Sequence, residues 1–146
     1  MSMNSPQLYL EYFARAEEFL QAYRDLPKDK APPPNWPRYF LFCQSIELVL
    51  KAYLAWHGVD ANSLKKFPFG HSLKALMAEA VSRGLAIGPL ARGEIELLDD
   101  AHTEHWPRYP ALGPGSKPVF IIDPFEPYVE ELFRGAHCLF GSKVGP

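Results

Sequence analysis

The pattern of apolar positions predicts one long helix over about residues 36–57, at the centre of the chain. This stretch is apolar on almost every side, which is typical of a helix buried in the middle of a bundle. A narrow polar seam interrupts it at Gln44, Glu47 and Lys51. Glu47 and Lys51 stand four residues apart in the favoured order, so we expect them to form an ion pair. The seam is either a structural ion pair at the edge of the core or the polar wall of a binding pocket.

Helical spacing and capping residues predict four further helices. They cover residues 6–25, residues 72–83, a segment that begins near residue 89 and continues towards residue 106, and residues 123–141. Asp123 and Glu126 stand at the positions of a capping box for the last helix. The residues expected to face the core are Leu8, Tyr12, Ala16, Phe19 and Tyr23, then Leu73, Leu76, Met77 and Ala80, then Leu90, Ile95, Leu97 and Leu98, and finally Phe125, Val129, Leu132, Phe133, Ala136 and Phe140.

The segments between these helices are predicted as loops. Residues 27–34 and 108–122 are rich in proline, and residues 59–70 form a connector in which Phe67 and Phe69 anchor the loop on the bundle. The whole chain, residues 1–146, therefore reads as a single all-α domain, a five-helix bundle of the up-and-down type with the 36–57 helix buried at its centre.

Composition supports a folded domain, since 47% of the residues are hydrophobic and 14% are aromatic. The net charge of −2 argues against a generally basic nucleic-acid surface. One local region is an exception: Lys65, Lys66, Lys74 and Arg83, interleaved with the two phenylalanines of the connector. Such a region can hold single-stranded nucleic acid, although a solvated edge with two buried aromatic rings gives the same pattern.

The two cysteines, Cys43 and Cys138, lie within apolar helical patterns and are expected to be free thiols that behave as small hydrophobic groups. The sequence shows no recognisable signal peptide and no apolar run of membrane-spanning length. We therefore expect a cytoplasmic protein with reduced thiols and no membrane partner.

Three segments together resemble one family. They are Ser-x-Glu-x-x-x-Lys-x-x-Leu from residue 45, Gly-His-x-Leu-x-x-Leu from residue 70, and Arg-Tyr-Pro at residues 108–110. In this order and spacing they resemble the HEPN domain superfamily of small helical bundles. The resemblance implies a HEPN-like bundle and a homodimer. It also implies either a metal-independent endoribonuclease, as in toxin–antitoxin systems, or a module that binds nucleotides or partner proteins.

The preferred hypothesis is a non-catalytic HEPN-like module that binds a nucleotide, nucleic acid or partner protein. Its site would consist of Glu47, Lys51, His71, Arg108 and Tyr109. Lys51 and Arg108 would meet an anionic group, and Tyr109 would offer a stacking face. Glu47 and His71 would orient these side chains. The other interpretation of these two residues is that a hydrogen bond between them is a structural tie between two helices. No cofactor is expected. A cognate nucleotidyltransferase or antitoxin is a possible protein partner.

A degenerate, toxin-like endoribonuclease is the alternative. The nuclease branch of the family carries Arg followed by His after four to six residues, and no Arg of this chain has a His at that spacing. The nearest candidates are Arg134 and His137, which are three positions apart and share a helical face. At a dimer interface they would serve as anion clamp and as general acid or base. A purely structural or interaction domain is the third hypothesis.

Asp99, His102 and His105 follow one another at three-residue spacing, near the predicted end of the fourth helix. Carboxylate and imidazole at this spacing can ligate zinc or manganese. Without a second ligand cluster the motif is weak, and histidines are also favoured at helix C-termini by the helix dipole. We therefore expect no metal.

Overall fold

The computed structural model describes residues 7–26, 36–99 and 123–144. These residues form six α-helices and one short 3-10 turn, and none of them forms a strand, so the predicted all-α class is confirmed for the described part of the chain. The elements are α1 (Leu8–Asp25), α2 (Trp36–Trp56), α3 (Ala61–Lys65), α4 (Leu73–Ser82), α5 (Pro89–Glu96), η1 (Asp123–Phe125) and α7 (Glu126–Val144).

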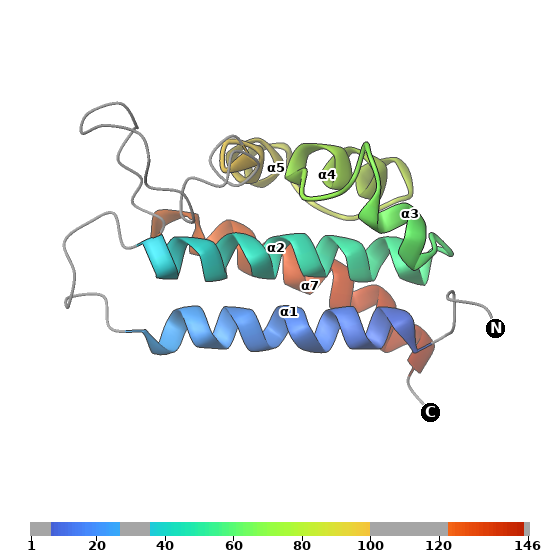
Figure 1. The fold of residues 1–146 in the computed structure, drawn as a ribbon, viewed down its shortest axis with the longest axis horizontal. Coiled ribbons are helices and arrows are strands. Elements are labelled where there is room, and N and C mark those ends of the chain that lie inside the picture. The colour runs from blue at the N-terminus through green and yellow to red at the C-terminus, as the bar shows by residue number, and fades with distance from the viewer. Residues whose placement is uncertain (1–6, 27–35, 100–122, 145–146) are drawn as a thin grey trace.

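The helices form a bundle around α2. Figure 1 shows α1 and α2 side by side and antiparallel along the long axis of the molecule, with α7 behind them. Helices α4 and α5 lie on the other side of α2 from α1 and are seen nearly end-on, so that their axes run across those of α1 and α2. α2 contacts α1, α4 and α7, while α5 packs on α4 and α7. The arrangement is therefore a helical bundle with two crossing helices rather than a simple up-and-down set.

The central position of α2 is confirmed. Its fully buried side chains include Phe42, Ile46, Leu50 and Leu54, and these form one continuous core with residues of α1, α4, α5 and α7. The helix ends at Trp56, and Gly58 follows with a φ of 96°, a conformation that only glycine adopts readily. A helix that contacts three neighbours leaves little room for polar residues, so its polar side chains need partners inside the protein.

The α4 helix matches its prediction closely. The Ser72 side chain accepts a hydrogen bond from the backbone nitrogen of Ala75 and so caps the helix. Gly84 stands just beyond the last turn with a φ of 103°. The four residues predicted to face inward, Leu73, Leu76, Met77 and Ala80, are all buried.

A short helix, α3, was missed in the connector. Five residues are too few to show a helical period, but Asp60 is a recognisable cap whose carboxylate accepts a hydrogen bond from the backbone nitrogen of Ser63 at 2.8 Å. Phe67 was wrongly expected to anchor this connector, since its side chain is 96% exposed. Phe69 does pack against the core.

The inward faces of α1 and α5 were partly wrong. In α1 the buried residues are Phe13, Ala16, Leu20 and Tyr23, while Leu8, Tyr12 and Phe19 are only half-buried at the flanks. In α5 the inward positions are Ala91, Ile95 and then Leu98, so that Leu90 and Leu97 are exposed on the opposite side. In both helices the predicted buried face is rotated by about one residue from the observed one. The prediction left out Phe13 in α1 and Ala91 in α5, which are buried. The α5 helix also ends at Glu96, well before the predicted end.

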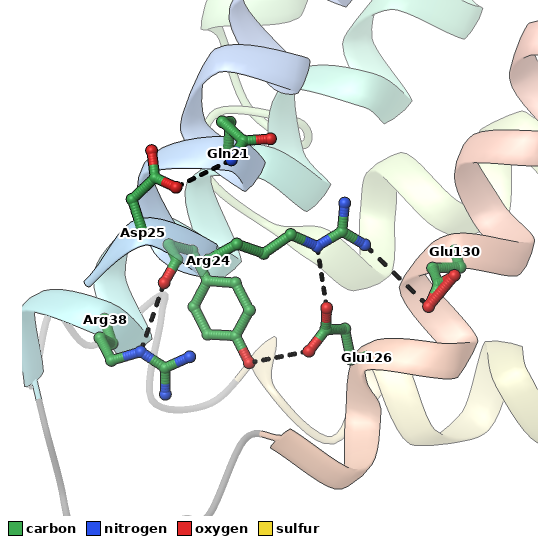
Figure 2. Close-up of polar contacts among 7 residues, drawn as sticks. Gln21, Arg24, Asp25, Arg38, Glu126 and Glu130 are labelled. Carbon is green, nitrogen blue, oxygen red and sulfur yellow. Dashed lines mark hydrogen bonds and ion pairs between the residues drawn. The ribbon is translucent and has the colours of Figure 1, made fainter. Parts of the chain in front are cut away.

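An ion pair to α1 holds the start of α7. Residues Asp123–Phe125 form the turn η1, and the Glu126 carboxylate binds Arg24 Nε at 2.8 Å. The same carboxylate accepts a hydrogen bond from the Tyr23 hydroxyl at 3.5 Å. Figure 2 shows how Arg24 bridges from α1 to Glu126 and to Glu130 on α7. The last helix continues to Val144, so Gly141 does not end it.

Two of the predicted loops, residues 27–34 and 108–122, lie outside the described residues. So does residue 6, the predicted start of the first helix.

Candidate functional site

Two of the predicted polar residues of α2 meet a histidine from the segment before α4. Lys51 Nζ lies 2.9 Å from Glu47 Oε2, which confirms the expected ion pair. His71 Nδ1 lies 3.2 Å from both carboxylate oxygens of Glu47. We call Glu47, Lys51 and His71 the polar centre. It brings together three of the five residues of the predicted ligand site, while Arg108 and Tyr109 lie outside the described residues.

Burial divides the polar centre into an inner and an outer part. The side chains of Glu47 and Lys51 are 2% and 9% exposed, whereas the side chain of His71 is 51% exposed. The negative charge is therefore inside the protein, next to a positive charge on the same helix, and the imidazole covers it from the solvent side. A buried carboxylate needs such partners, and here they also hold the start of α4 against α2. Gln44 Oε1, one turn earlier, is buried and accepts no hydrogen bond from the described residues.

Asp99 has a structural contact that the sequence did not suggest. Its carboxylate accepts a hydrogen bond from the backbone nitrogen of Leu73, so it binds the N-terminus of α4 together with the Ser72 cap. A carboxylate at this end of a helix is favoured by the helix dipole. His102 and His105, the other members of the weak metal motif, lie outside the described residues. Within the described ranges, no three His, Cys, Asp or Glu side chains form a group that fits a metal ion.

An open pocket lies between α1 and α7. Its volume is about 880 Å³, and we call it the α1–α7 pocket. The residues that line it are Phe13 and Glu17 from α1, Ala86 from the segment before α5, and Glu131, Phe133, Arg134, Gly135 and His137 from α7. Arg134 and His137, which the spacing places on one helical face, both line this pocket.

Three of the residues that line the α1–α7 pocket have aromatic rings, Phe13, Phe133 and His137. The His137 ring lies 5.7 Å from the Phe13 ring, centroid to centroid, with an interplanar angle of 34°. The Phe133 ring lies 6.0 Å from the same Phe13 ring. Arg134 is exposed, and its guanidinium makes no ion pair or hydrogen bond with any described residue. The pocket therefore offers flat apolar faces beside a cation that is not neutralised by a described neighbour.

The edge of the same pocket is shaped by a close approach of two backbones. Glu131 Oε2 accepts a hydrogen bond from the backbone nitrogen of Gly88 at 2.6 Å, which ties the 85–88 segment to α7. A methyl group added at Gly135 would lie 2.5 Å from the backbone oxygen of Ala86. Only glycine allows this contact, so Gly135 sets how closely the segment and α7 approach.

Arg38 is a buried charged residue that the sequence analysis missed. It is 4% exposed, and its Nε donates a hydrogen bond to the backbone oxygen of Tyr23 at 3.3 Å. Its guanidinium carbon also lies 4.2 Å from the centroid of the Tyr23 ring, in cation–π geometry. Figure 2 shows Arg38 at the end of α1, where the last helical carbonyls need donors. The sequence does contain a signal for this residue, since Arg38 is a lone charged residue in the apolar first turns of α2.

Cys43 and His57 are among the groups whose pKa values are shifted. Burial raises the pKa of the Cys43 thiol far above its ordinary value, so this cysteine is an inert core residue and not a nucleophile. Burial and the nearby Arg83 lower the pKa of His57. His57 Nε2 is buried and forms no hydrogen bond with the described residues.

Comparison of the chain with protein-family models, with curated proteins and with solved structures finds no match. The likeness to the HEPN superfamily therefore rests on the three sequence segments alone. Across the described residues, no helix combines the length and the apolar character needed to cross a membrane.

Proposed function

We propose that this chain is a non-catalytic, HEPN-like helical module that binds a nucleotide or the end of an RNA strand in the α1–α7 pocket. One observation carries the proposal: the Arg134 guanidinium, which has no partner among the described residues, lies on the wall of an open pocket that aromatic rings also line. Arginine binds phosphate oxygens with two parallel hydrogen bonds, and bases stack on aromatic side chains. A volume of about 880 Å³ is also of the size that small-molecule sites have in proteins.

The charges in the pocket wall restrict the ligand. Glu17 and Glu131 accompany Arg134 there, so a ligand with one phosphate is favoured over a polyphosphate. The Glu131 carboxylate already accepts a hydrogen bond from Gly88. Glu17 is exposed and is able to accept a hydrogen bond from the amino group of a base.

The polar centre has a supporting role in this proposal. Its carboxylate already binds a lysine and a histidine, and the pair is almost completely buried. A ligand phosphate at Lys51 would have to displace Glu47, which would leave a buried carboxylate with one partner fewer. We therefore assign Glu47, Lys51 and His71 to holding α4 against α2, and Arg134 to the ligand.

The test is to titrate the protein with AMP, ATP and a short RNA. Calorimetry measures the affinity of each ligand, and thermal unfolding measures the melting temperature of the protein in its presence. We expect AMP to bind and to raise the melting temperature. The Arg134→Gln variant should lose roughly tenfold or more in affinity, because a hydrogen bond to a charged group is removed. Arg92→Gln, on α5 and outside the pocket lining, is the matched control and should bind as the wild type does.

Two results would overturn the assignment of the ligand to this pocket. One is an Arg134→Gln variant that binds every ligand with wild-type affinity. The other is a Lys51→Ala variant that stays folded, as measured by circular dichroism, and yet loses binding while Arg134→Gln retains it. That second result would move the site to the polar centre.

A metal-independent endoribonuclease is the second candidate, because Arg134 and His137 line one pocket. Arg134 would bind the scissile phosphate, and the His137 imidazole would take a proton from the attacking 2′-hydroxyl or give one to the leaving oxygen. The family resemblance implies that such activity requires a homodimer. Incubating the protein with labelled RNA and a chelator tests it, with His137→Gln as control and sedimentation to measure the oligomeric state. No cleavage by concentrated wild-type protein would rule this candidate out.

A further inference from the structure

A second, smaller pocket lies between the first half of α1 and the short helix α3. Its volume is about 200 Å³, and we call it the α1–α3 pocket. The residues that line it are Leu8, Glu11, Tyr12 and Arg15 from α1, and Ala61 and Lys65 from α3. None of them belongs to the α1–α7 pocket or to the polar centre.

Two cations, Arg15 and Lys65, line this small space together with one carboxylate, that of Glu11. Arg15 and Lys65 are exposed, and neither side chain forms an ion pair or hydrogen bond with a described residue. They stand fifty positions apart in the sequence, and the fold places both in the lining of one pocket. Like charges that line one pocket repel each other, and an anion between them would turn that repulsion into attraction.

Tyr12 adds a neutral donor to the same lining. Burial raises the pKa of Tyr12 above its ordinary value, Arg15 lowers it, and the carboxylates of Glu47 and Glu11 raise it further. The phenol is therefore protonated at neutral pH and able to donate a hydrogen bond. It makes no hydrogen bond with a described residue, so its donor is available to a ligand.

The size of the pocket limits the occupant. Small-molecule sites in proteins usually span about 300–1,000 Å³, and one water takes about 30 Å³ in the liquid. A space of about 200 Å³ is too small for a whole nucleotide and large enough for one anionic group with a few waters. The described lining contains two cations and one carboxylate, so the net charge of these lining residues is positive.

We propose that the α1–α3 pocket binds a phosphate group, either as free inorganic phosphate or as the phosphate of a small monoester. Arg15 supplies a pair of parallel donors, Lys65 a point charge, and Tyr12 a hydroxyl donor. Glu11 opposes the anion and weakens its binding. This site is independent of the proposed ligand pocket, because the two share no lining residue.

The experiment titrates the full chain with inorganic phosphate and, separately, with phenyl phosphate, at constant ionic strength set with sodium chloride. Binding is followed by calorimetry and by amide shifts in NMR spectra. Tighter binding of phenyl phosphate identifies a monoester site, and tighter binding of inorganic phosphate identifies a site for the free ion. Arg15→Gln and Lys65→Gln should each weaken binding roughly tenfold or more. Lys66→Gln, the exposed neighbour outside the lining, should leave the affinity unchanged.

Glu11→Gln provides a test with the opposite sign. Removing the one carboxylate of the lining should tighten phosphate binding several-fold, and a variant that gains affinity is necessarily folded. The proposal is wrong if phosphate shows no saturable binding up to about 10 mM. It is also wrong if the three charge variants at positions 11, 15 and 65 bind as Lys66→Gln does. Because Arg134→Gln leaves this pocket intact, failure here and failure of the proposed ligand pocket are measured separately.

Discussion

The polar centre and the α1–α7 pocket use similar residue types to opposite effect. Each contains a cation and a histidine, Lys51 with His71 in the first and Arg134 with His137 in the second. In the polar centre both groups converge on Glu47, whose side chain is 2% exposed. In the pocket, Arg134 has no partner among the described residues and His137 lies against an aromatic ring.

The difference teaches which property separates a structural cluster from a candidate binding site. A buried cation beside a buried carboxylate already has its ionic partner. Separating the two charges would leave each desolvated without a partner, at a cost of several kcal/mol in free energy. An exposed cation on an apolar wall carries no such penalty, and a ligand phosphate can reach it directly. Helical spacing is the same kind of signal in both cases, so spacing alone does not distinguish them.

Removing the carboxylate of the polar centre should have the largest effect. We expect Glu47→Ala to lower the free energy of unfolding by about 3–5 kcal/mol, because Lys51 is left as a buried charge without its partner. Urea unfolding measures this. The control is Glu79→Ala, which removes the partner of Arg83 in an ion pair of the same i,i+4 type that is more than one-third exposed at both ends. That change should lower the free energy of unfolding by less than about 1 kcal/mol.

The double variant Glu47→Leu with Lys51→Met sharpens the same comparison. It replaces both charges with apolar groups of similar size, so the protein should recover most of the stability lost in Glu47→Ala. A double variant as unstable as the single one would mean that packing around these side chains, and not the unpaired charge, carries the effect.

A substitution that fills the space between α7 and the 85–88 segment should have the next largest effect on stability. Gly135→Ala places a methyl group against the backbone oxygen of Ala86, and overlap with a backbone atom should lower stability by about 1–3 kcal/mol. Gly93→Ala is the matched control, because a methyl group on this α5 glycine meets nothing within 4 Å. It should raise stability by up to about 1 kcal/mol through helix propensity. Thermal unfolding distinguishes the two, and a stabilised Gly135→Ala would contradict the close approach.

A third histidine, His57, should give a smaller effect that depends on pH. Its ring packs against Tyr53 at 4.7 Å and has no carboxylate partner among the described ion pairs, unlike that of His71. Burial and Arg83 lower its pKa in the folded state below the ordinary 6.5. The unfolded chain then binds more protons, so stability is complete above the unfolded pKa and is lost as the pH falls through 6.5 towards the folded value.

The His57 prediction is measured by urea unfolding between pH 7.5 and pH 5.5, a window of about two units around the ordinary histidine value. We expect His57→Gln to lose less stability over this range than the wild type does. An identical loss in both proteins would mean that His57 does not contribute to the pH dependence. Comparison of the variant with the wild type also separates His57 from His71, which is present in both.

Much of the fold was accessible from local patterns. The apolar run of α2, the Ser72 cap and the glycines at 58 and 84 predict helices whose ends match the structure within a residue or two. The ion pair within α2 followed from spacing alone. These features depend on the chain only within a few residues, which is why a linear pattern contains them.

The remaining features depended on contacts between distant segments. Arg24 with Glu126, Leu73 with Asp99 and Arg38 with Tyr23 are pairings that no local period predicts. The rotation of the buried stripe in α1 and α5 was likewise decided by which neighbour each helix faces.

By itself, the sequence determined the helical class, the central helix and the pairing of Glu47 with Lys51. Only the tertiary structure decided that this pair is buried while Arg134 lines an open pocket. It also decided that Arg15 and Lys65 line one pocket. The physical reason is that burial and the distance between charges depend on how helices pack. Residues far apart in the chain come into contact only in the folded bundle.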